Sequence, residues 1–405
     1  MIQPVLIIGA GPYGVSVALE LSRRRIPFVI CGDPFALWFN HTLERASLRS
    51  DVHVSEVFTK DRRFRLDDFL TRTLPVAQAD AIRRGRIPVS VFRDYLRHVQ
   101  ASLPFPIVRE KIVSLDKRCG QFIAQTTSGQ VIAASQVILA CGLESHQRLP
   151  EALKHLNGHV VHAWQTQRYE HLRGKRVLVI GSGQSAGEAV WLLRHDNTVT
   201  WVHRTPPDFF ADPIALPRPI FALAMRTSHI FSMMPAWLQR KLRQNLLSST
   251  MTPDLREDVF ASNVHAVQTD AGELGLTVSQ GAIDSARLKR SFDLVIACTG
   301  YRHRLSNLAF LSPALLGLAR CDAEGMPLLD RAFRTSVPGL YVVGAMAEPK
   351  HGPAMRFMSG CRTTALLLGA AVEKELNLLH TSETAPAIVT RPATPHRQPS
   401  VMNRP

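Results

Sequence analysis

Val5-Leu6-Ile7-Ile8-Gly9-Ala10-Gly11-Pro12-Tyr13-Gly14 is an apolar run followed by a glycine-rich turn. The stretch from Val177 to Ala186 repeats this plan, with the turn Gly181-Ser182-Gly183-Gln184-Ser185-Ala186. Each apolar run predicts a buried strand, and each turn has the Gly-x-Gly-x-x-Gly/Ala spacing that leads from a strand into a helix. One such turn is a weak signal, but two in one chain predict that the protein holds two nucleotides.

The residue types in these turns follow from the geometry of dinucleotide binding. The first glycine permits the tight turn, the second lets the backbone approach a pyrophosphate, and the third position must be small so that the helix packs on the sheet. The phosphates then meet free N–H groups at the start of the helix. We therefore expect ten binding positions in the two turns: Gly9, Gly11, Pro12, Tyr13, Gly14, Gly181, Gly183, Gln184, Ser185 and Ala186.

The residue after the second strand of each unit predicts which ribose is bound. An acidic side chain about 20 residues beyond the glycine turn binds a 2′-hydroxyl, whereas an arginine accommodates a 2′-phosphate. Asp33 holds this place after the first turn and Arg204 holds it after the second. The first site is thus expected to take an unphosphorylated ribose, as in FAD, and the second to prefer NADPH. Because Asp33 precedes Pro34, it has an alternative role as a turn-stabilising residue.

Composition places the chain among soluble globular proteins. Its 405 residues suffice for two domains, and 45% are apolar and 20% charged. The sequence has no run of 18 or more apolar residues, so no membrane span is predicted. A strand that starts at Val5 leaves no room for a signal peptide. The six cysteines form no Cys-x-x-Cys pair, which predicts reduced core thiols in a cytoplasmic protein and argues against a redox-active disulfide. These cysteines are Cys31, Cys119, Cys141, Cys298, Cys321 and Cys361.

The net charge of +15 raises the question of an acidic partner. Short basic clusters occur at residues 23–25, 62–65 and 83–86, but no run reaches the five or six like charges that mark a binding tail. We interpret them as a solvated basic surface and expect no nucleic-acid partner. The positive field also suits two anionic dinucleotides.

The order of the elements predicts an α/β fold with two Rossmann-like dinucleotide-binding domains, the second inserted into the first. Each unit starts with a strand–helix–strand segment, passes through a strand-rich stretch, and reaches a similar strand that ends in Cys141-Gly142 or in Cys298-Thr299-Gly300. The strand–helix–strand segments are expected at residues 5–9, 11–24 and 28–31, and at residues 176–181, 185–194 and 199–202. The strand-rich stretches are residues 111–133 and 266–283.

After Gly300 the chain is expected to return to the first unit through a strand at residues 340–344 and a helix at residues 353–374. The predicted boundaries are residues 1–150 and 300–380 for the first domain, residues 151–299 for the second, and residues 381–405 for a disordered Thr- and Pro-rich tail. Residues 219–247 fit this scheme least. They are apolar, carry arginines and are divided by Pro235, which leaves three interpretations open: packed helices, a substrate lid, or a helix on a membrane surface.

At this level of detail the chain resembles the flavin-dependent monooxygenases that bind FAD and NADPH in tandem Rossmann domains. It is most similar to the branch that contains N-hydroxylating amine monooxygenases and proteins described as FAD-dependent urate hydroxylases. The resemblance covers about residues 1–370 and rests on the two glycine turns and on three further segments. These segments are Cys298-Thr299-Gly300-Tyr301, the strand region from Thr335 to Gly344, and His351-Gly352-Pro353 through Arg356-Phe357.

The resemblance implies positions for further site residues. Gly300, Tyr301, Gly344 and Pro353 fall where the family binds its cofactors, and Trp38 falls where it approaches the flavin. The helix starting near Pro353 is expected to aim N–H groups at the flavin pyrimidine. The candidate pocket residues are Arg49, Ser50, Asp51, His162, His351 and Arg356. Two departures from the family pattern are Gly32, where an acidic residue is usual, and Leu156, where the signature has phenylalanine.

The implied reaction is hydroxylation of a small molecule, at an amine nitrogen, another heteroatom or a heteroaromatic ring. NADPH delivers a hydride to the flavin, the reduced flavin forms a peroxyflavin with O₂, and one oxygen atom passes to the substrate. The resemblance implies no obligatory acid–base pair, so we name no general base. A strand histidine with a structural partner remains the simpler interpretation of His162.

Two other enzymes are alternatives to this function, whereas a non-enzymatic nucleotide-binding sensor would rarely need two adjacent redox cofactors. A flavin reductase or dehydrogenase that does not oxygenate its substrate would use the same two domains. Gly183-Gln184-Ser185-Ala186-Gly187 also matches the Gly-x-Ser-x-Gly motif of serine hydrolases, with Ser185 as nucleophile and His351 as partner. That alternative leaves the first turn and Arg204 unexplained. A metal site at His155, His159 and His162 is not expected, because Gly158 and two valines interrupt a helix there and no carboxylate accompanies it.

Overall fold

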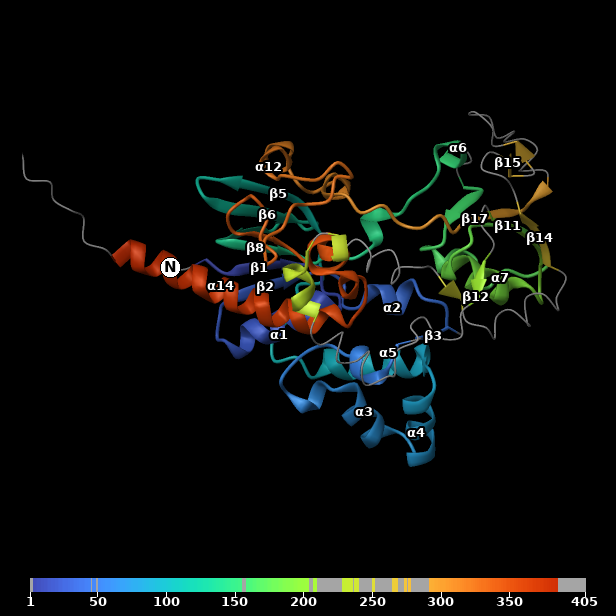
Figure 1. The fold of residues 1–405 in the computed structure, drawn as a ribbon, viewed down its shortest axis with the longest axis horizontal. Coiled ribbons are helices and arrows are strands. Elements are labelled where there is room, and N and C mark those ends of the chain that lie inside the picture. Colours follow the sequence, from blue (N-terminus) through green and yellow to red (C-terminus); the bar gives the residue numbers. More distant parts are fainter. Residues whose placement is uncertain are drawn as a thin grey trace, which may run out of the picture.

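The computed structural model describes residues 3–44, 46–48, 50–154, 158–203, 207–209, 228–235, 237–239, 250–251, 264–268, 273–274, 276–277 and 291–384. Two parallel sheets form the centres of two units that lie next to each other (Figure 1). The first has the strand order β18-β8-β1-β2 and the second the order β14-β11-β10-β17-β9. The strands of the first sheet are β1 (Val5–Ile8), β2 (Phe28–Cys31), β8 (Gln136–Leu139) and β18 (Leu340–Val342).

Alternating apolar side chains of β1 divide the first unit into layers. Val5 and Ile7 point to the helical face, while Leu6 and Ile8 point to an antiparallel sheet on the other side. Because both faces are covered, all four residues are buried, as expected for a parallel strand. The helical face holds α1 (Pro12–Arg23), α5 (Val89–Ala101) and α14 (Gly360–Thr384), and the antiparallel sheet holds β5 (Ile112–Arg118), β6 (Gln121–Thr126) and β7 (Val131–Ala134).

The second unit repeats the strand–helix–strand start of the first. Its central strand β10 pairs in parallel with β11 on one side and β17 on the other. Helix α7 covers one face, where Ala189, Val190 and Leu193 pack on Val177, Val179 and Trp201. The bounds are β9 (Val160–His162), β10 (Arg176–Ile180), α7 (Gln184–Leu193), β11 (Thr198–His203), β14 (Val264–Gln268) and β17 (Leu294–Ala297).

Two chain segments join the units and run antiparallel to each other. One leaves β8 and the other returns from β17, with Gln147 bridging Tyr301. The Arg302 N–H donates to the His146 carbonyl at 2.8 Å, and the Arg148 N–H donates to the Gly300 carbonyl at 3.0 Å. Since β18 then completes the first sheet beside β8, the second unit is inserted into the first. The α/β fold class with an inserted Rossmann-like unit is confirmed, while the exact domain boundaries stay a prediction.

The remaining elements are short. The helices are α2 (Ala36–Asn40), α3 (Leu66–Thr73), α4 (Val76–Arg84), α6 (Glu151–Lys154), α12 (Pro313–Leu318) and α13 (Glu348–His351). The strands are β3 (Ser47–Leu48), β4 (Ile87–Pro88), β12 (Asp208–Phe209), β13 (Thr250–Met251), β15 (Glu273–Leu274) and β16 (Leu276–Thr277). The 3₁₀ turns are η1 (Val52–Val54), η2 (Arg62–Phe64), η3 (Glu144–His146), η4 (Thr166–Arg168), η5 (Ser228–Met233), η6 (Leu305–Asn307), η7 (Gly344–Ala347) and η8 (Pro353–Arg356).

The single helix expected at residues 353–374 is wrong. The chain forms the 3₁₀ turn η8, passes through Phe357 in extended conformation, and starts α14 only at Gly360. The reason is a contact from far away in the sequence. The Tyr13 hydroxyl lies within hydrogen-bonding distance of the carbonyl oxygens of Ala354, Met355 and Phe357, which a continuous helix would use for its own N–H groups.

The expected tail starts later than predicted, because α14 continues to Thr384; residues 385–405 lie outside the described part. The cysteines also need a correction. All six are free, but Cys119 and Cys321 are exposed rather than buried in the core. Cys119 lies at a hairpin turn with a φ of +48°, which apolar neighbours do not cover.

Most of residues 219–247 lies outside the described part. Among the residues of this segment that the structure describes, η5 is a 3₁₀ turn that contains the buried Phe231. Phe231 packs closely on Gly352, because a Cβ on that glycine would lie 2.6 Å from the Phe231 Cγ. This segment of the inserted unit therefore contacts the first unit. The three interpretations of residues 219–247 stay predictions.

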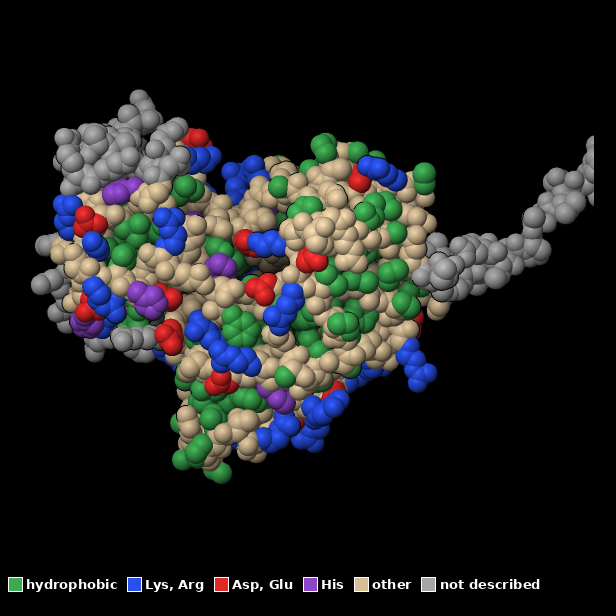
Figure 2. All heavy atoms as spheres, turned by 180° about the vertical axis from the view of Figure 1, so that it is seen from behind, with side chains coloured by type: hydrophobic (Ala, Val, Ile, Leu, Met, Phe, Trp, Pro, Cys, Tyr) green, Lys and Arg blue, Asp and Glu red, His purple; other side chains and the backbone are tan. Residues whose placement is uncertain are grey.

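The surface agrees with a dispersed distribution of charge. Figure 2 shows lysine and arginine side chains scattered over one face, with acidic side chains among them. No helix in the described ranges combines the length and the apolar composition that crossing a bilayer requires.

Candidate functional site

The first glycine turn is shaped by two close backbone approaches. Gly9 has a φ of +111°, and a Cβ there would lie 2.2 Å from the Ala140 carbonyl oxygen. A Cβ on Gly14 would lie 1.9 Å from the Gly9 carbonyl oxygen. Gly11 is different: it caps α1 in extended conformation, and a Cβ there would meet nothing within 4 Å. The protein's own packing does not require a glycine at this position, so the open space suits a group that approaches the backbone from outside.

The second turn has the same construction. Gly181 has a φ of +137°, and a Cβ there would lie 2.3 Å from the Cys298 carbonyl oxygen. Gly183 caps α7 in extended conformation, and Ala186 is fully buried behind it. The indole N–H of Trp201 donates to the Gly181 carbonyl at 2.7 Å, a contact that no sequence pattern indicated. At the helix start, the side chain of Gln184 donates to Glu188 at 2.8 Å and Ser185 is exposed.

Tyr13 ties the first turn to η8. Its hydroxyl lies 2.9 Å from the Met355 carbonyl oxygen and 2.8 Å from that of Phe357. Burial raises the pKa of Tyr13 well above 10, so the hydroxyl keeps its proton and acts as a donor. Gly360 makes room for this oxygen, because a Cβ there would lie 2.1 Å from it. Gly344 lies next to the Tyr13 ring, because a Cβ on Gly344 would lie 3.7 Å from the ring atom Cδ2.

Of the two positions expected to select the ribose, Asp33 and Arg204, the structure describes only Asp33. Gly32 has a φ of +136°, and a Cβ there would lie 2.9 Å from the Ala10 N, so the chain passes closely behind the first turn. Asp33 follows it with an exposed carboxylate that accepts from the Asn40 side chain at 3.3 Å. Arg204 lies outside the described residues.

Trp38 on α2 presents an indole N–H that is buried without an acceptor among the described residues. Its ring makes an edge contact with Phe92 of α5, with centroids 4.7 Å apart. A buried donor without an acceptor is costly unless a ligand or water supplies one. Trp38 therefore fits the proposed position beside a polar ligand.

The loop at Ser50 and Asp51 is held by local contacts. The Asp51 carboxylate accepts from the His53 N–H at 2.9 Å and thereby caps η1. The Ser50 hydroxyl accepts from that of Ser55 at 2.9 Å. Arg49 lies outside the described residues.

His162 and Tyr301 belong to the junction of the two units. His162 donates from Nε2 to the Gly300 carbonyl at 3.0 Å and accepts from the Trp164 N–H at Nδ1, at 3.1 Å. Burial lowers the pKa of His162, which keeps it neutral. Both ring nitrogens thus have structural partners. Tyr301 contacts the His162 ring edge-on, with centroids 5.2 Å apart.

His351, Pro353 and Arg356 lie on the segment that Tyr13 contacts. The His351 ring stacks on Phe333 with centroids 3.7 Å apart, and its Nε2 donates to the Asp330 carbonyl at 3.1 Å. Burial lowers the pKa of His351 to about 4, and its buried Nδ1 has no partner among the described residues. Pro353 is buried and Arg356 is exposed.

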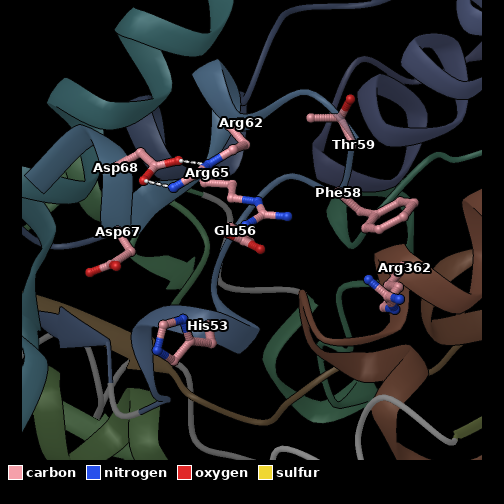
Figure 3. Close-up of a pocket in the computed structure, with 9 residues that line it drawn as sticks. All are labelled: His53, Glu56, Phe58, Thr59, Arg62, Arg65, Asp67, Asp68 and Arg362. Carbon is pink, nitrogen blue, oxygen red and sulfur yellow. Dashed lines mark hydrogen bonds and ion pairs between the residues drawn. The ribbon is translucent and has the colours of Figure 1, made fainter.

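A polar cavity of about 160 Å³ lies between side chains of residues 53–68 and Arg362 of α14 (Figure 3). Arg65 and Arg362 approach it from opposite sides. Phe58 forms one wall and packs with Cys361 and Tyr13, and the Arg362 guanidinium lies 5.1 Å from the centroid of its ring. Asp68 pairs with Arg62 at one side of the cavity. The full lining is His53, Glu56, Phe58, Thr59, Arg62, Arg65, Asp67, Asp68 and Arg362.

The structure brings the predicted residues into two sets and gives no support to the hydrolase alternative. Tyr13, Gly344 and η8 meet in the first unit, whereas Gly300, Tyr301 and His162 meet at the junction. His351 is engaged with Phe333 and Asp330 rather than with Ser185. Within the described ranges no group of three or more His, Cys, Asp or Glu side chains is placed to hold a metal; His155 lies outside them.

Comparisons with known proteins agree with this arrangement. A probable indole-3-pyruvate monooxygenase of Arabidopsis thaliana, YUCCA7, is 27% identical over 254 residues, which cover 58% of this chain and 54% of the plant protein. The chain thus spans about half the length of this relative. The L-lysine N6-monooxygenase of Escherichia coli is 24% identical over 363 residues, covering 77% of this chain and 79% of that protein.

A solved structure has the same fold. The ornithine N-hydroxylase of Kutzneria sp. 744, with reduced FAD, NADP⁺ and L-ornithine, superimposes with a TM-score of 0.75 over 93% of this chain and 100% of its own, at 16% identity. The model of the family described as pyridine nucleotide-disulphide oxidoreductase matches residues 6–215, more than half of the sequence. Both glycine turns lie inside that match. The chain therefore belongs to the pyridine nucleotide-disulphide oxidoreductase family.

Proposed function

We propose that this protein is a flavoprotein monooxygenase that uses FAD, NADPH and O₂ to hydroxylate a small molecule. The observation that carries the proposal is the pair of glycine turns. Gly9 and Gly181 each back onto the carbonyl oxygen at the end of a neighbouring strand, and Gly11 leaves open space in front of the helix start. A glycine that backs onto a strand-end carbonyl before a helix start is the construction that a dinucleotide pyrophosphate needs, and this part of it occurs in both turns.

In this proposal FAD binds to the unit formed by residues 1–150 and 300–380. The turn from Gly9 to Gly14 holds the pyrophosphate, and Asp33 binds the ribose hydroxyls, for which its exposed carboxylate is suited. Trp38 offers its buried indole N–H, and Gly344 and Pro353 lie next to the Tyr13 contact. The open space in front of Gly11, which no protein atom within 4 Å of its Cβ position fills, supports the fit of this site to the FAD pyrophosphate.

NADPH binds to residues 151–299 in the proposal. The turn from Gly181 to Ala186, with Gln184 and Ser185 at the helix start, faces the pyrophosphate, and Arg204 binds the 2′-phosphate. Gly300 and Tyr301 border this unit at the junction. Exchange of Arg204 for alanine is expected to weaken binding of NADPH and to leave NADH nearly unaffected, and equal losses for both would refute that role.

When bound, the flavin supplies hydride acceptance and O₂ activation. The protein's own residues bind, orient and exclude water. Tyr13 keeps its proton because burial raises its pKa, so it holds η8 to the first turn over the whole working pH range. His162 is neutral and bonded at both nitrogens, so it positions the Gly300 carbonyl rather than moving a proton. His351, with a pKa lowered to about 4 and an Nδ1 that has no partner among the described residues, is available as a neutral polar contact.

The substrate is proposed to be a small polar molecule that carries an amine nitrogen, another heteroatom or a heteroaromatic ring. The cavity whose lining includes Phe58 supports a polar substrate, because arginine and carboxylate side chains make up most of the remaining lining. Its volume of about 160 Å³ suits a fragment of a few heavy atoms rather than a dinucleotide.

The test is reconstitution followed by isotopic labelling. Purified protein is incubated with FAD, and flavin absorbance, NADPH oxidation and products from a panel of amines and heteroaromatic compounds are measured under labelled O₂. We expect a yellow protein and a product that carries one labelled oxygen atom. The Gly11→Val variant should remain folded but fail to retain flavin, since its side chain enters only the open space.

The remaining alternative is an FAD-dependent reductase that does not oxygenate a substrate, and it has the same domains. Steady NADPH oxidation that releases all O₂ as hydrogen peroxide, or that requires another acceptor, would select the reductase. A protein that takes up no flavin would refute both functions.

A further inference from the structure

A segment of the first unit reaches into the second. We call residues 38–44 the strap; they begin on α2, which lies between the two units in Figure 1. Leu43 is buried in the core of the second unit with Val161 and Tyr169. At the other end, Trp38 packs on Phe92 of the first unit. The strap is therefore a physical connection between the two units that carry the candidate nucleotide sites.

The second unit holds the strap by polar and aromatic contacts. The Thr166 hydroxyl donates to the Asn40 carbonyl at 3.2 Å. His41 donates from Nδ1 to the Trp164 carbonyl at 2.9 Å and stacks on the Trp164 ring, with centroids 4.0 Å apart. Trp164 in turn contacts the Tyr301 ring edge-on.

In the first unit, one side chain hydrogen-bonds the strap at two points. Arg93 on α5 donates from Nε to the Trp38 carbonyl and from Nη2 to the Thr42 carbonyl, both at 2.7 Å. The guanidinium is planar and its donors have a fixed geometry, so two bonds to two carbonyls fix the orientation of the strap as well as its distance. A lysine in its place has no such fork.

We propose that Arg93 is a positioning residue for hydride transfer between the two cofactors. It touches neither cofactor site directly, but it sets the strap that joins Trp38 at the first site to Trp164 and Tyr301 at the second. This inference rests on the proposed function. Since a displacement of 1 Å in a reacting geometry lowers a rate by about 100-fold, loss of the clamp should slow hydride transfer by about 10- to 100-fold.

The test compares flavin reduction by NADPH, which involves the second unit, with flavin reduction by dithionite, which does not. Flavin-loaded wild type, Arg93→Met and Arg93→Lys are mixed with saturating NADPH or with dithionite, and the limiting rate of flavin bleaching is measured. We expect Arg93→Met to slow only the NADPH reaction, with flavin content and the Kd for NADPH unchanged, and Arg93→Lys to recover part of the rate. The control is Arg63→Met, because Arg63 is exposed and its guanidinium contacts Asp61 and the Phe64 ring, both close to it in sequence.

Thr166→Val gives a second variant, since it removes the second unit's hydrogen bond to the Asn40 carbonyl with little change in side-chain shape. It should slow the NADPH reaction in the same sense. Hydrogen exchange of the strap amides, measured without cofactor, should rise in Arg93→Met. An unchanged NADPH rate, an equal loss with dithionite, or unchanged exchange would overturn the proposal. A wild type without flavin would refute the proposed function instead, and the exchange measurement would still decide whether Arg93 holds the strap.

Discussion

The two glycine turns solve the same geometric problem, yet they depend on different parts of the chain. In both, the first glycine has a positive φ and backs onto a carbonyl oxygen, of Ala140 in one and Cys298 in the other. The second turn is closed by Cys298 and by Trp201, which both belong to the inserted unit. The first turn is tied through Tyr13 to residues 354–357, close to the end of the described chain.

The third position of the turns shows a further difference. A Cβ on Gly14 would lie 1.9 Å from the Gly9 carbonyl oxygen, whereas Ala186 carries a buried methyl group at the corresponding place. The helix of the first unit thus lies closer to its turn. The comparison teaches that the motif fixes the strand-to-helix bend, while contacts outside the motif decide what each turn is coupled to.

Substitution of the first glycine in each turn should give the largest effect. Gly9→Ala and Gly181→Ala each place a methyl group against a backbone carbonyl at a positive φ, so we expect each to lower the free energy of unfolding by at least about 2 kcal/mol. If the units act separately, Gly9→Ala loses flavin, and Gly181→Ala stays yellow but loses NADPH-dependent reduction. Urea unfolding and flavin absorbance measure both outcomes.

Gly317→Ala is the matched control for these variants, because a Cβ there meets nothing within 4 Å in α12. It should leave stability unchanged or slightly increased. Loss of flavin from Gly181→Ala to the same extent as from Gly9→Ala would break the comparison of the two units.

Acid should act at the junction between the units. Burial lowers the pKa of both His146 and His303 to about 4, from an ordinary value of 6.5, and the two rings lie 4.9 Å apart. Between about pH 4 and pH 6.5 these two histidines bind protons in the unfolded chain but not in the folded chain. The free energy of unfolding therefore falls as the pH drops from about 6.5 toward 4. Unfolding midpoints at about pH 7.5 and about pH 5 measure the decrease.

The double variant His146→Gln/His303→Gln should show a smaller decrease over the same interval, since two groups that take up protons on unfolding are gone. An identical pH dependence in wild type and the double variant would place the acid sensitivity elsewhere, for example at His351.

Removal of one hydroxyl from each unit should have a smaller effect. Tyr13→Phe removes the donor to η8, and Tyr169→Phe removes the donor to the Ala163 carbonyl in the second unit, at 2.9 Å. Each should lower stability by about 1 kcal/mol. Only Tyr13→Phe should also weaken flavin retention, which titration with FAD can measure. Equal effects on flavin would contradict a special coupling of the first turn.

Ser185→Ala should have the smallest effect. Ser185 is exposed at the start of α7, at the position that Tyr13 holds in the first unit. We expect a change in stability within about 0.5 kcal/mol and normal NADPH-dependent turnover. Complete loss of a measured esterase activity would instead restore the hydrolase alternative.

Local patterns predicted the fold well, because the strands, the glycine turns and the first helices depend on neighbours in sequence. The expected strands at residues 28–31 and 199–202 lie within β2 and β11 as observed. The strand-rich stretch at residues 111–133 forms β5, β6 and β7, and the chain returns to β18, as predicted. The stretch at residues 266–283 lies only in part within the described residues, as the end of β14 and as β15 and β16.

Contacts between distant residues account for what sequence could not predict. The helix break near Phe357 comes from Tyr13, and the role of Arg93 comes from two carbonyl groups on α2 and beyond it. No periodicity marks Trp201 as a donor to Gly181 or Phe231 as a neighbour of Gly352. For the site, sequence predicted the residues of the turns, while Asp51 and His162 turned out to be engaged in structural hydrogen bonds.

The place of β18 beside β8 sets the order in which the protein can mature on the ribosome. Strand β8 ends at Leu139, but its partner begins at Leu340. At roughly 5–20 residues per second, the growing polypeptide carries a sheet with an open edge for some tens of seconds while the inserted unit is made. That edge is a site for chaperone capture or for pairing with another nascent chain. Cofactor loading into the first unit therefore belongs among the last events of biosynthesis.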